Sequence, residues 1–174
     1  MSPGVDLRSF GYGHGAPDQG WGDLPAEAHV VMDVRGHFRD PHVSPELRHL
    51  TAADDRVRAA VLATPGAAAL AERITGVAMA YLAGPGRGPV IIAVGCAGGR
   101  HRSAVIADHA ARLLNQRGVP ATVTHRDLHR PVIDRAAGQP AVPCLAGPAV
   151  RVAGAVTSGE PVVARTSGGR PSCA

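Results

Sequence analysis

The fold is decided by residues 89–106, which read Pro89-Val-Ile-Ile-Ala-Val-Gly-Cys96-Ala-Gly-Gly-Arg-His-Arg-Ser103-Ala-Val-Ile106. The residues after Pro89 are apolar and rich in β-branched side chains, and Gly95 ends the run. A run this short, with a proline before it and a glycine after it, is typical of a buried strand. The stretch therefore predicts a buried strand that leads into a glycine-rich loop.

A helical pattern follows the loop. Ser103 stands where an N-cap residue would begin a helix, and Gly118 stands where a glycine would end it. Between them, four residues recur at helical spacing, namely Ile106, Ala110, Leu113 and Arg117. The whole unit is predicted to be a strand, a loop and a helix in that order.

The loop between this strand and this helix has the chemistry of an anion site. The first N–H groups of a helix lack partners, and the positive end of the helix dipole faces the loop. Gly98 and Gly99 let the backbone turn its amides inward without a Cβ clash. Arg100, His101 and Arg102 add side-chain donors, and a guanidinium can hold phosphate through two bonds. We expect a phosphate or a carboxylate here, the alternative being a basic turn without a ligand.

The composition fits one domain of moderate size. The 174 residues are 45% hydrophobic, which is enough for a sizeable core, but only 3% are aromatic. The core must therefore consist of alanine, valine, leucine and isoleucine. Arginine supplies all 18 positive charges because the chain has no lysine, and the net charge is +4. This mild basic bias permits an anionic partner without requiring one.

The cysteines and the hydropathy indicate a compartment. Cys96, Cys144 and Cys173 are an odd number, and no secretory signal precedes them, so a reducing compartment and a cytoplasmic location are expected. No run approaches the roughly 18 apolar residues that cross a bilayer, so no membrane association is expected.

Other segments of the chain alternate between strand and helix patterns. Strands are predicted over 5–10, 28–34 and 121–125, and packing helices over 54–62 and 70–81. The strand, helix and strand across 89–126 predict a parallel pair. The fold class is therefore α/β, a single domain over residues 5–135 with a small mixed, partly parallel sheet of about four strands between helices.

Two regions outside this core carry less information. Residues 136–174 are rich in glycine, proline and alanine without a sustained period, which predicts a disordered tail. The segment after the strand at 121–125 contains Asp127 and His129, and we expect it to be a solvated loop. The histidines lack the spacing of a metal site, so neither a metal nor a cofactor is predicted.

The central loop also matches the signature of cysteine phosphatases. These enzymes have a cysteine, five residues, an arginine and then a serine or threonine, and Cys96, Arg102 and Ser103 fit that spacing. A Cys96 thiolate would attack phosphate held by Arg102, and Ser103 would stabilise the departing thiolate. Gly95 stands where these enzymes usually have a histidine. A phosphatase is therefore the catalytic alternative to a binding domain.

A longer resemblance covers the chain from Ser9 to about Arg130, which resembles the C-terminal domain of the RapZ family of RNase adaptor proteins. The matching motifs come in order and are Ser9-Phe-Gly-Tyr-Gly-His-Gly15, Asp33-Val-Arg35, Asp40-Pro-His42, Pro45-Glu-Leu-Arg48, the loop from Gly95 to Ser103, and His125-Arg-Asp127. The resemblance implies an α/β domain related in shape to part of phosphofructokinase. It also implies a sensor of glucosamine-6-phosphate that, in some members, binds small RNAs and an RNase.

Carried over by position, the resemblance implies a sugar-phosphate site, to which the anion-loop argument adds Ser103. The implied residues are Asp33, His42, Cys96, Gly98, Gly99, His101 and Arg102. Ala97 replaces a threonine frequent in the family, and without lysine no Gly-Lys nucleotide loop can exist. Candidate RNA-binding residues are Arg126, Arg130 and Arg135, which stand in place of a lysine-rich end. The favoured function is binding of a phosphorylated small molecule, with an RNA or protein partner and a homo-oligomer left open.

Overall fold

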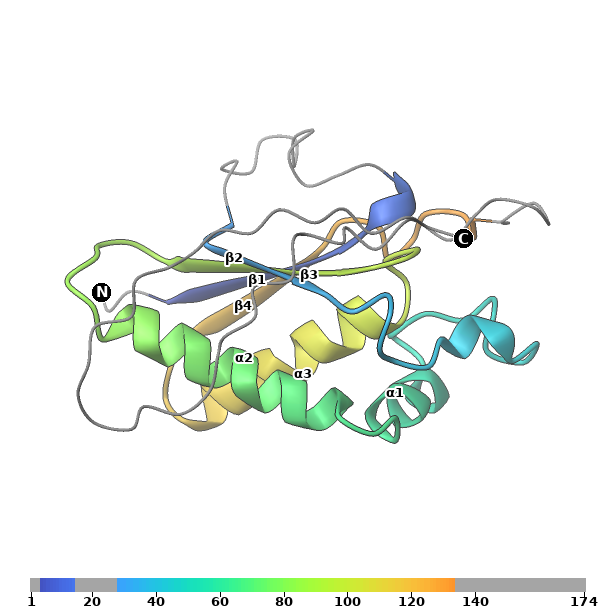
Figure 1. The fold of residues 1–174 in the computed structure, drawn as a ribbon, viewed down its shortest axis with the longest axis horizontal. Coiled ribbons are helices and arrows are strands. Elements are labelled where there is room, and N and C mark those ends of the chain that lie inside the picture. Colours follow the sequence, from blue (N-terminus) through green and yellow to red (C-terminus); the bar gives the residue numbers. More distant parts are fainter. Residues whose placement is uncertain (1–3, 15–27, 134–174) are drawn as a thin grey trace, which may run out of the picture. The chain divides into compact units, whose positions relative to one another are not determined.

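The computed structural model describes residues 4–14 and 28–133, so the predicted tail at 136–174 and Arg135 lie outside the described residues. These described residues contain four strands, three α-helices and two short 3-10 helices (Figure 1). They are β1 (Val5–Gly11), η1 (Tyr12–His14), β2 (Val30–Asp33), η3 (Pro41–Val43), α1 (Asp55–Leu62), α2 (Ala67–Leu82), β3 (Val90–Cys96), α3 (Arg102–Gln116) and β4 (Ala121–His125). The predicted α/β class is confirmed.

The strands form one sheet in the order β2-β3-β1-β4. Each of the three pairings is parallel, so within the described residues the sheet is more uniform than the mixed sheet that the sequence predicted. The strands joined by α3 are parallel as expected, but β1 lies between them. The sequence does not distinguish a connection between neighbouring strands from one that skips a strand. The prediction therefore missed that β1 lies between β3 and β4.

Burial follows the order of the strands. The central strand β3 is buried at all seven positions, and β1 at six of seven, which fits their nearly continuous apolar sequences. The edge strand β2 instead alternates between half-buried and exposed residues. The run after Pro89 is therefore the centre of the molecule, as its sequence predicted.

The main core lies between the sheet and the helices. Figure 1 shows α1, α2 and α3 on the same side of the sheet, so within the described residues the expected α-helices flank one of its faces. Helix α3 packs against the sheet through small and branched residues, and its buried apolar side chains are Ala104, Val105, Ile106, Ala107, Ala110, Ala111 and Leu114. A second, smaller cluster contains Phe10 and Ala93, which point to the other face.

The helix ends agree with the sequence prediction except at one point. The Asp54 carboxylate accepts the Arg56 amide at 2.9 Å and caps α1. Gly118 adopts a φ of 76° directly after α3, as a terminating glycine does. Ser103 is not the N-cap of α3, because the helix begins at Arg102 and places Ser103 in its first turn.

A parallel sheet brings the carboxyl ends of its strands to one edge. Helices η1 and η3 and the start of α3 also lie at this edge (Figure 1). Ligands of open α/β sheets bind outside the carboxyl ends of the strands.

Within the described residues, no helix is both long and apolar enough to span a bilayer.

Candidate functional site

The loop after β3 is folded around the sulfur of Cys96. The Gly99 amide donates to Cys96 Sγ at 3.2 Å, and Ser103 Oγ lies 3.1 Å from the same atom. Ser103 Oγ is also 3.2 Å from the Phe10 carbonyl oxygen, which links the loop to β1. Cys96 is 3% exposed. The buried sulfur atom therefore connects the loop to the first turn of α3. The Ser103 hydroxyl contacts this sulfur atom and does not cap the helix.

The amino end of α3 has no side-chain cap. The N-cap residue His101 makes no side-chain capping bond, unlike the Asp54 cap of α1. The first amides of a helix lack partners within it and attract negative charge. Beside them, a Cβ added at Gly98 would meet no atom within 4 Å. The loop thus has both donors and space on its outer side.

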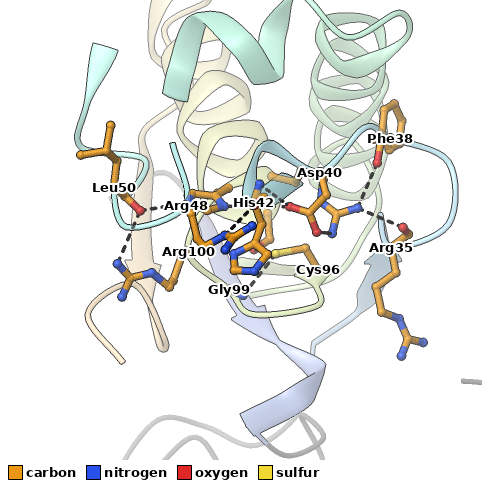
Figure 2. A network of polar contacts seen from close by, with 12 residues as sticks. Arg35, Phe38, Asp40, His42, Arg48, Leu50, Cys96, Gly99 and Arg100 are labelled. Carbon is orange, nitrogen blue, oxygen red and sulfur yellow. Dashed lines mark hydrogen bonds and ion pairs between the residues drawn. The ribbon is translucent and has the colours of Figure 1, made fainter. Parts of the chain in front are cut away.

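Arg102 takes a different position from the bidentate anion grip that the sequence predicted. Its Nη1 donates to the carbonyl oxygens of Arg35 and Phe38, both at 3.0 Å, and its Nη2 donates to the Asp40 carboxylate. Figure 2 shows these three acceptor residues gathered at one place. The Arg102 side chain is 4% exposed. Segment 34–40 turns its carbonyl groups toward the start of α3, so the guanidinium binds protein oxygens. Arg102 holds this segment in place.

The two residues before Arg102 hold the next part of the same segment. His101 Nε2 lies 2.9 Å from the Leu50 carbonyl oxygen, and Arg100 Nη2 donates to the His49 carbonyl at 3.0 Å. Figure 2 shows Arg100 beside Leu50, whose carbonyl oxygen lies 3.5 Å from Arg100 Nη2. The Ala52 amide in turn donates to the Arg100 carbonyl at 2.9 Å. Three consecutive side chains at the start of α3 therefore anchor the chain between β2 and α1.

The pKa of His101 predicts a pH dependence of stability. Burial holds this pKa below its ordinary value, although the Leu50 carbonyl and Asp40 act in the opposite direction. The native ring stays neutral while the unfolded chain takes up a proton below about pH 6.5. The stabilisation is therefore complete above that pH and is lost as the pH falls through it. We expect the free energy of unfolding to fall between about pH 7.5 and pH 5.5.

Urea unfolding of two variants tests this dependence. His101→Gln keeps a donor for the Leu50 carbonyl but cannot titrate, so its stability should vary less with pH than that of the wild type. His37→Gln changes an exposed histidine and serves as the control. Equal pH dependence in the wild type and His101→Gln would contradict the assignment to His101.

Asp33 and His42 lie beside the loop, on the segments before it. Asp33 ends β2 next to Gly95 in the sheet register, and its carboxylate forms an ion pair of 2.7 Å with Arg35. The hydrogen bond from Arg35 lowers the pKa of Asp33. The Arg35 guanidinium stacks over the Tyr12 ring at 3.7 Å from its centroid. The Asp33 carboxylate is therefore charged and half-exposed at the sheet edge.

The backbone of His42 is held by hydrogen bonds through both its amide and its carbonyl group. Its amide donates to Asp40 Oδ1 at 3.1 Å, and its carbonyl oxygen accepts from Arg48 Nε at 3.3 Å (Figure 2). His42 is also one of the groups that lower the pKa of His101, the residue directly before α3. The structure thus brings Asp33 and His42 to the same edge as the glycine-rich loop.

The carboxylates of Asp127 and Asp40 make contacts at the site that the sequence did not predict. Asp127 was predicted to lie in a solvated loop, which is wrong, because its side chain is 0% exposed. Its Oδ2 accepts the Gly11 amide at 2.7 Å and pairs with Arg126 at 2.7 Å. The clue in the sequence is its place directly after a strand of a parallel sheet, where side chains converge on one edge. Nothing local in the sequence pairs Asp40 with Arg102, 62 residues away.

A serine, a histidine and an aspartate also form a chain of contacts in the core. Ser9 Oγ lies 2.7 Å from His125 Nδ1, and His125 Nε2 lies 3.2 Å from the Asp108 carboxylate. Ser9 is 0% exposed, so a substrate cannot reach its hydroxyl. The three residues come from β1, β4 and α3, and they join these elements together.

Fold and site together define a class of protein. It is a small α/β domain with a parallel sheet, whose carboxyl edge carries a glycine-rich loop and the open start of a helix. The chain belongs to the family of the RapZ C-terminal domain, because the model of that family matches residues 3–129. The resemblance carried by the sequence motifs is thereby confirmed.

The curated relatives agree with this assignment. The chain is 40% identical over 129 residues to a protein of Thermobifida fusca and 42% identical over 129 residues to one of Rhodospirillum rubrum, both called nucleotide-binding protein. A nucleotide-binding protein of Streptomyces coelicolor is 37% identical over 127 residues. The matches cover 71–72% of this chain but only 37–41% of these relatives. The chain therefore spans about two fifths of their length.

Proposed function

We propose that this domain binds a phosphorylated small molecule, an amino-sugar phosphate such as glucosamine-6-phosphate, and acts as a sensor or adaptor. The observation that carries the proposal is the start of α3, which has no side-chain cap and lies beside the open space at Gly98. Phosphate oxygens suit such backbone donors. Membership in the RapZ C-terminal domain family supports the same ligand class.

The side chains around the loop divide into two roles. Gly98 offers its backbone to the phosphate, and Gly99 shapes the binding loop through its amide bond to Cys96 Sγ. Asp33 and His42 approach the sugar from the neighbouring segments. The other residues hold the loop and its neighbouring segments in place through hydrogen bonds within the protein. They are Cys96, His101, Arg102 and Ser103. Arg102 thus serves binding as a positioning residue, because its guanidinium already contacts protein oxygens.

Titration calorimetry with glucosamine-6-phosphate, glucosamine and inorganic phosphate tests the proposal. We expect the sugar phosphate to bind and to raise the melting temperature, because a ligand of the folded state stabilises it. His42→Ala should weaken binding roughly tenfold, since a hydrogen bond to a charged group contributes about 1.5–3 kcal/mol. His37→Ala, in the same segment and exposed, is the control. No binding of any of the three compounds to the wild type would contradict the proposal.

Phosphatase activity is the catalytic alternative, and one contact favours it. Ser103 Oγ lies 3.1 Å from Cys96 Sγ, as expected if the serine stabilises a departing thiolate. Against it, Arg102 turns toward Asp40, away from the loop, and Cys96 is buried. The same preparations distinguish the two functions. Cys96→Ser should keep sugar-phosphate binding, whereas hydrolysis of an aryl phosphate that disappears in this variant would favour the phosphatase.

An RNA partner has weaker support than the small ligand. Arg126 and Arg130 both pair with Asp127, which reduces the charge they present to a phosphate backbone. We therefore propose that RNA association is weak and strongly salt-dependent.

Cys96 is a free thiol in the structure, which supports our placement of the protein in the cytoplasm.

A further inference from the structure

A cluster of charged side chains lies on the other side of the glycine-rich loop. Its centre is the buried Asp127 carboxylate, which pairs with Arg126 at 2.7 Å and with Arg130 at 3.1 Å. Arg100 joins through its Nη1, which donates to the Arg130 carbonyl at 2.5 Å. Electrostatic interactions couple His14 to all four of these residues. We call these five residues the His14 cluster.

The cluster contains donors without acceptors. His14 Nε2 and Arg100 Nε are buried nitrogen atoms that have no hydrogen-bond partner among the described residues, and the buried Asp127 Oδ1 has only its ion pair with Arg130. A buried polar group without a partner costs about 1–3 kcal/mol, and native proteins leave few of them. Two such nitrogen atoms in one cluster therefore point to an acceptor that the described residues do not supply.

The charges of the cluster favour an anion as that acceptor. Two guanidinium groups, of Arg126 and Arg130, pair with the single carboxylate of Asp127. The Arg100 guanidinium, whose Nη1 donates to the Arg130 carbonyl, brings a third positive charge. Burial lowers the pKa of His14, and the three arginines lower it further, while Asp127 acts in the opposite direction. The imidazole is thus neutral and can donate from Nε2. Positive charge exceeds negative charge around the unpartnered nitrogens.

Gly99 separates the cluster from the site proposed above. Its amide faces Cys96 Sγ, whereas a Cβ added to it would lie 2.7 Å from the Asp127 Cβ. We propose that the His14 cluster binds a second oxyanion of the phosphate class, which accepts hydrogen bonds from His14 Nε2 and Arg100 Nε. This site does not depend on the function proposed for the loop. The phosphoryl group can be free phosphate or the second phosphate of a bisphosphorylated ligand.

Titration with inorganic phosphate, followed by NMR of the histidine rings, tests this site. We expect phosphate to shift the His14 ring resonances and to raise the pKa of His14, so that phosphate binds more tightly as the pH falls. Arg130→Gln should lower the affinity for phosphate, measured by the shift of the His14 resonances, roughly tenfold. The Arg130 side chain is largely exposed, so the fold should tolerate this change. His109, whose pKa burial also lowers, is the internal control ring. His14 resonances that stay unchanged at every phosphate concentration would overturn the proposal and show that water satisfies these atoms.

Two further comparisons separate this site from the loop site and identify the source of the phosphate. His42→Ala should leave the phosphate effect on His14 unchanged, even if it abolishes sugar-phosphate binding. If one bisphosphorylated sugar fills both sites, its affinity falls in His42→Ala and in Arg130→Gln alike. If free phosphate fills the cluster, the sugar monophosphate loses affinity only in His42→Ala. Loss of the His14 response in His42→Ala would contradict two separate sites.

Discussion

Replacing Arg102 with alanine is expected to lower the free energy of unfolding by about 3 kcal/mol or more. The guanidinium is 4% exposed and donates to the carbonyl oxygens of Arg35 and Phe38 and to the Asp40 carboxylate. Without it, these acceptors lose their partner, and segment 34–40 loses its attachment to α3. Lysine should restore little of the stability, because its single ammonium cannot reproduce a planar fork.

Urea unfolding measures the effect, and the same helix provides the control. Arg112→Ala removes an exposed arginine from α3 and should change the stability by no more than about 0.5 kcal/mol. The expected contrast is therefore a large loss at one position and nearly none at the other, ten residues apart. Equal stability of the two variants would show that the contacts of Arg102 do not hold the segment.

Replacing Gly99 with alanine is the second change with a large expected effect. Gly99 has a φ of 75°, which costs a residue with a Cβ about 1–2 kcal/mol. The added Cβ would also lie 2.8 Å from the Gly11 amide nitrogen and 2.7 Å from the Asp127 Cβ. Overpacking of this kind adds about 1–3 kcal/mol. We expect a total loss of about 3 kcal/mol, or a failure to fold.

The neighbouring glycine is a matched control for this variant. Gly98→Ala places the same methyl group one residue earlier, where it meets no atom within 4 Å. Thermal unfolding should show a native-like melting temperature for Gly98→Ala and a strongly lowered one for Gly99→Ala. A Gly99→Ala protein as stable as Gly98→Ala would mean that the loop can move away from β1 at little cost.

The sequence predicted the elements better than their connections. The apolar run after Pro89 became the buried β3, and Gly118 ended α3 as expected. Both features depend on residues close together in the chain, which is why patterns reveal them. The parallel arrangement of all four strands and the placement of the helices on one face depend on pairings between distant segments.

The candidate site shows the same division. The glycine-rich loop and the helix after it were visible in a short stretch, because spacing alone defines them. The partners of Arg102 were not, since the Asp40 carboxylate and two carbonyl groups reach it from more than 60 residues earlier. Asp127 was misplaced for a similar reason, because the Gly11 amide that binds it is 116 residues away. Side-chain chemistry predicted which groups could bind an anion but not which protein atoms would compete for them.

The chain between β2 and α1 contains little regular structure, yet it is fixed by three neighbouring side chains, two directly before α3 and one at its first position. Arg100, His101 and Arg102 hold its carbonyl groups at both ends of the segment. To expose His42 fully to solvent, all three contacts must break at once, so amide hydrogen exchange in this segment should follow a single opening event. A ligand that displaces the start of α3 should therefore also displace this entire segment. Its roughly twenty residues are expected to open or close as one unit.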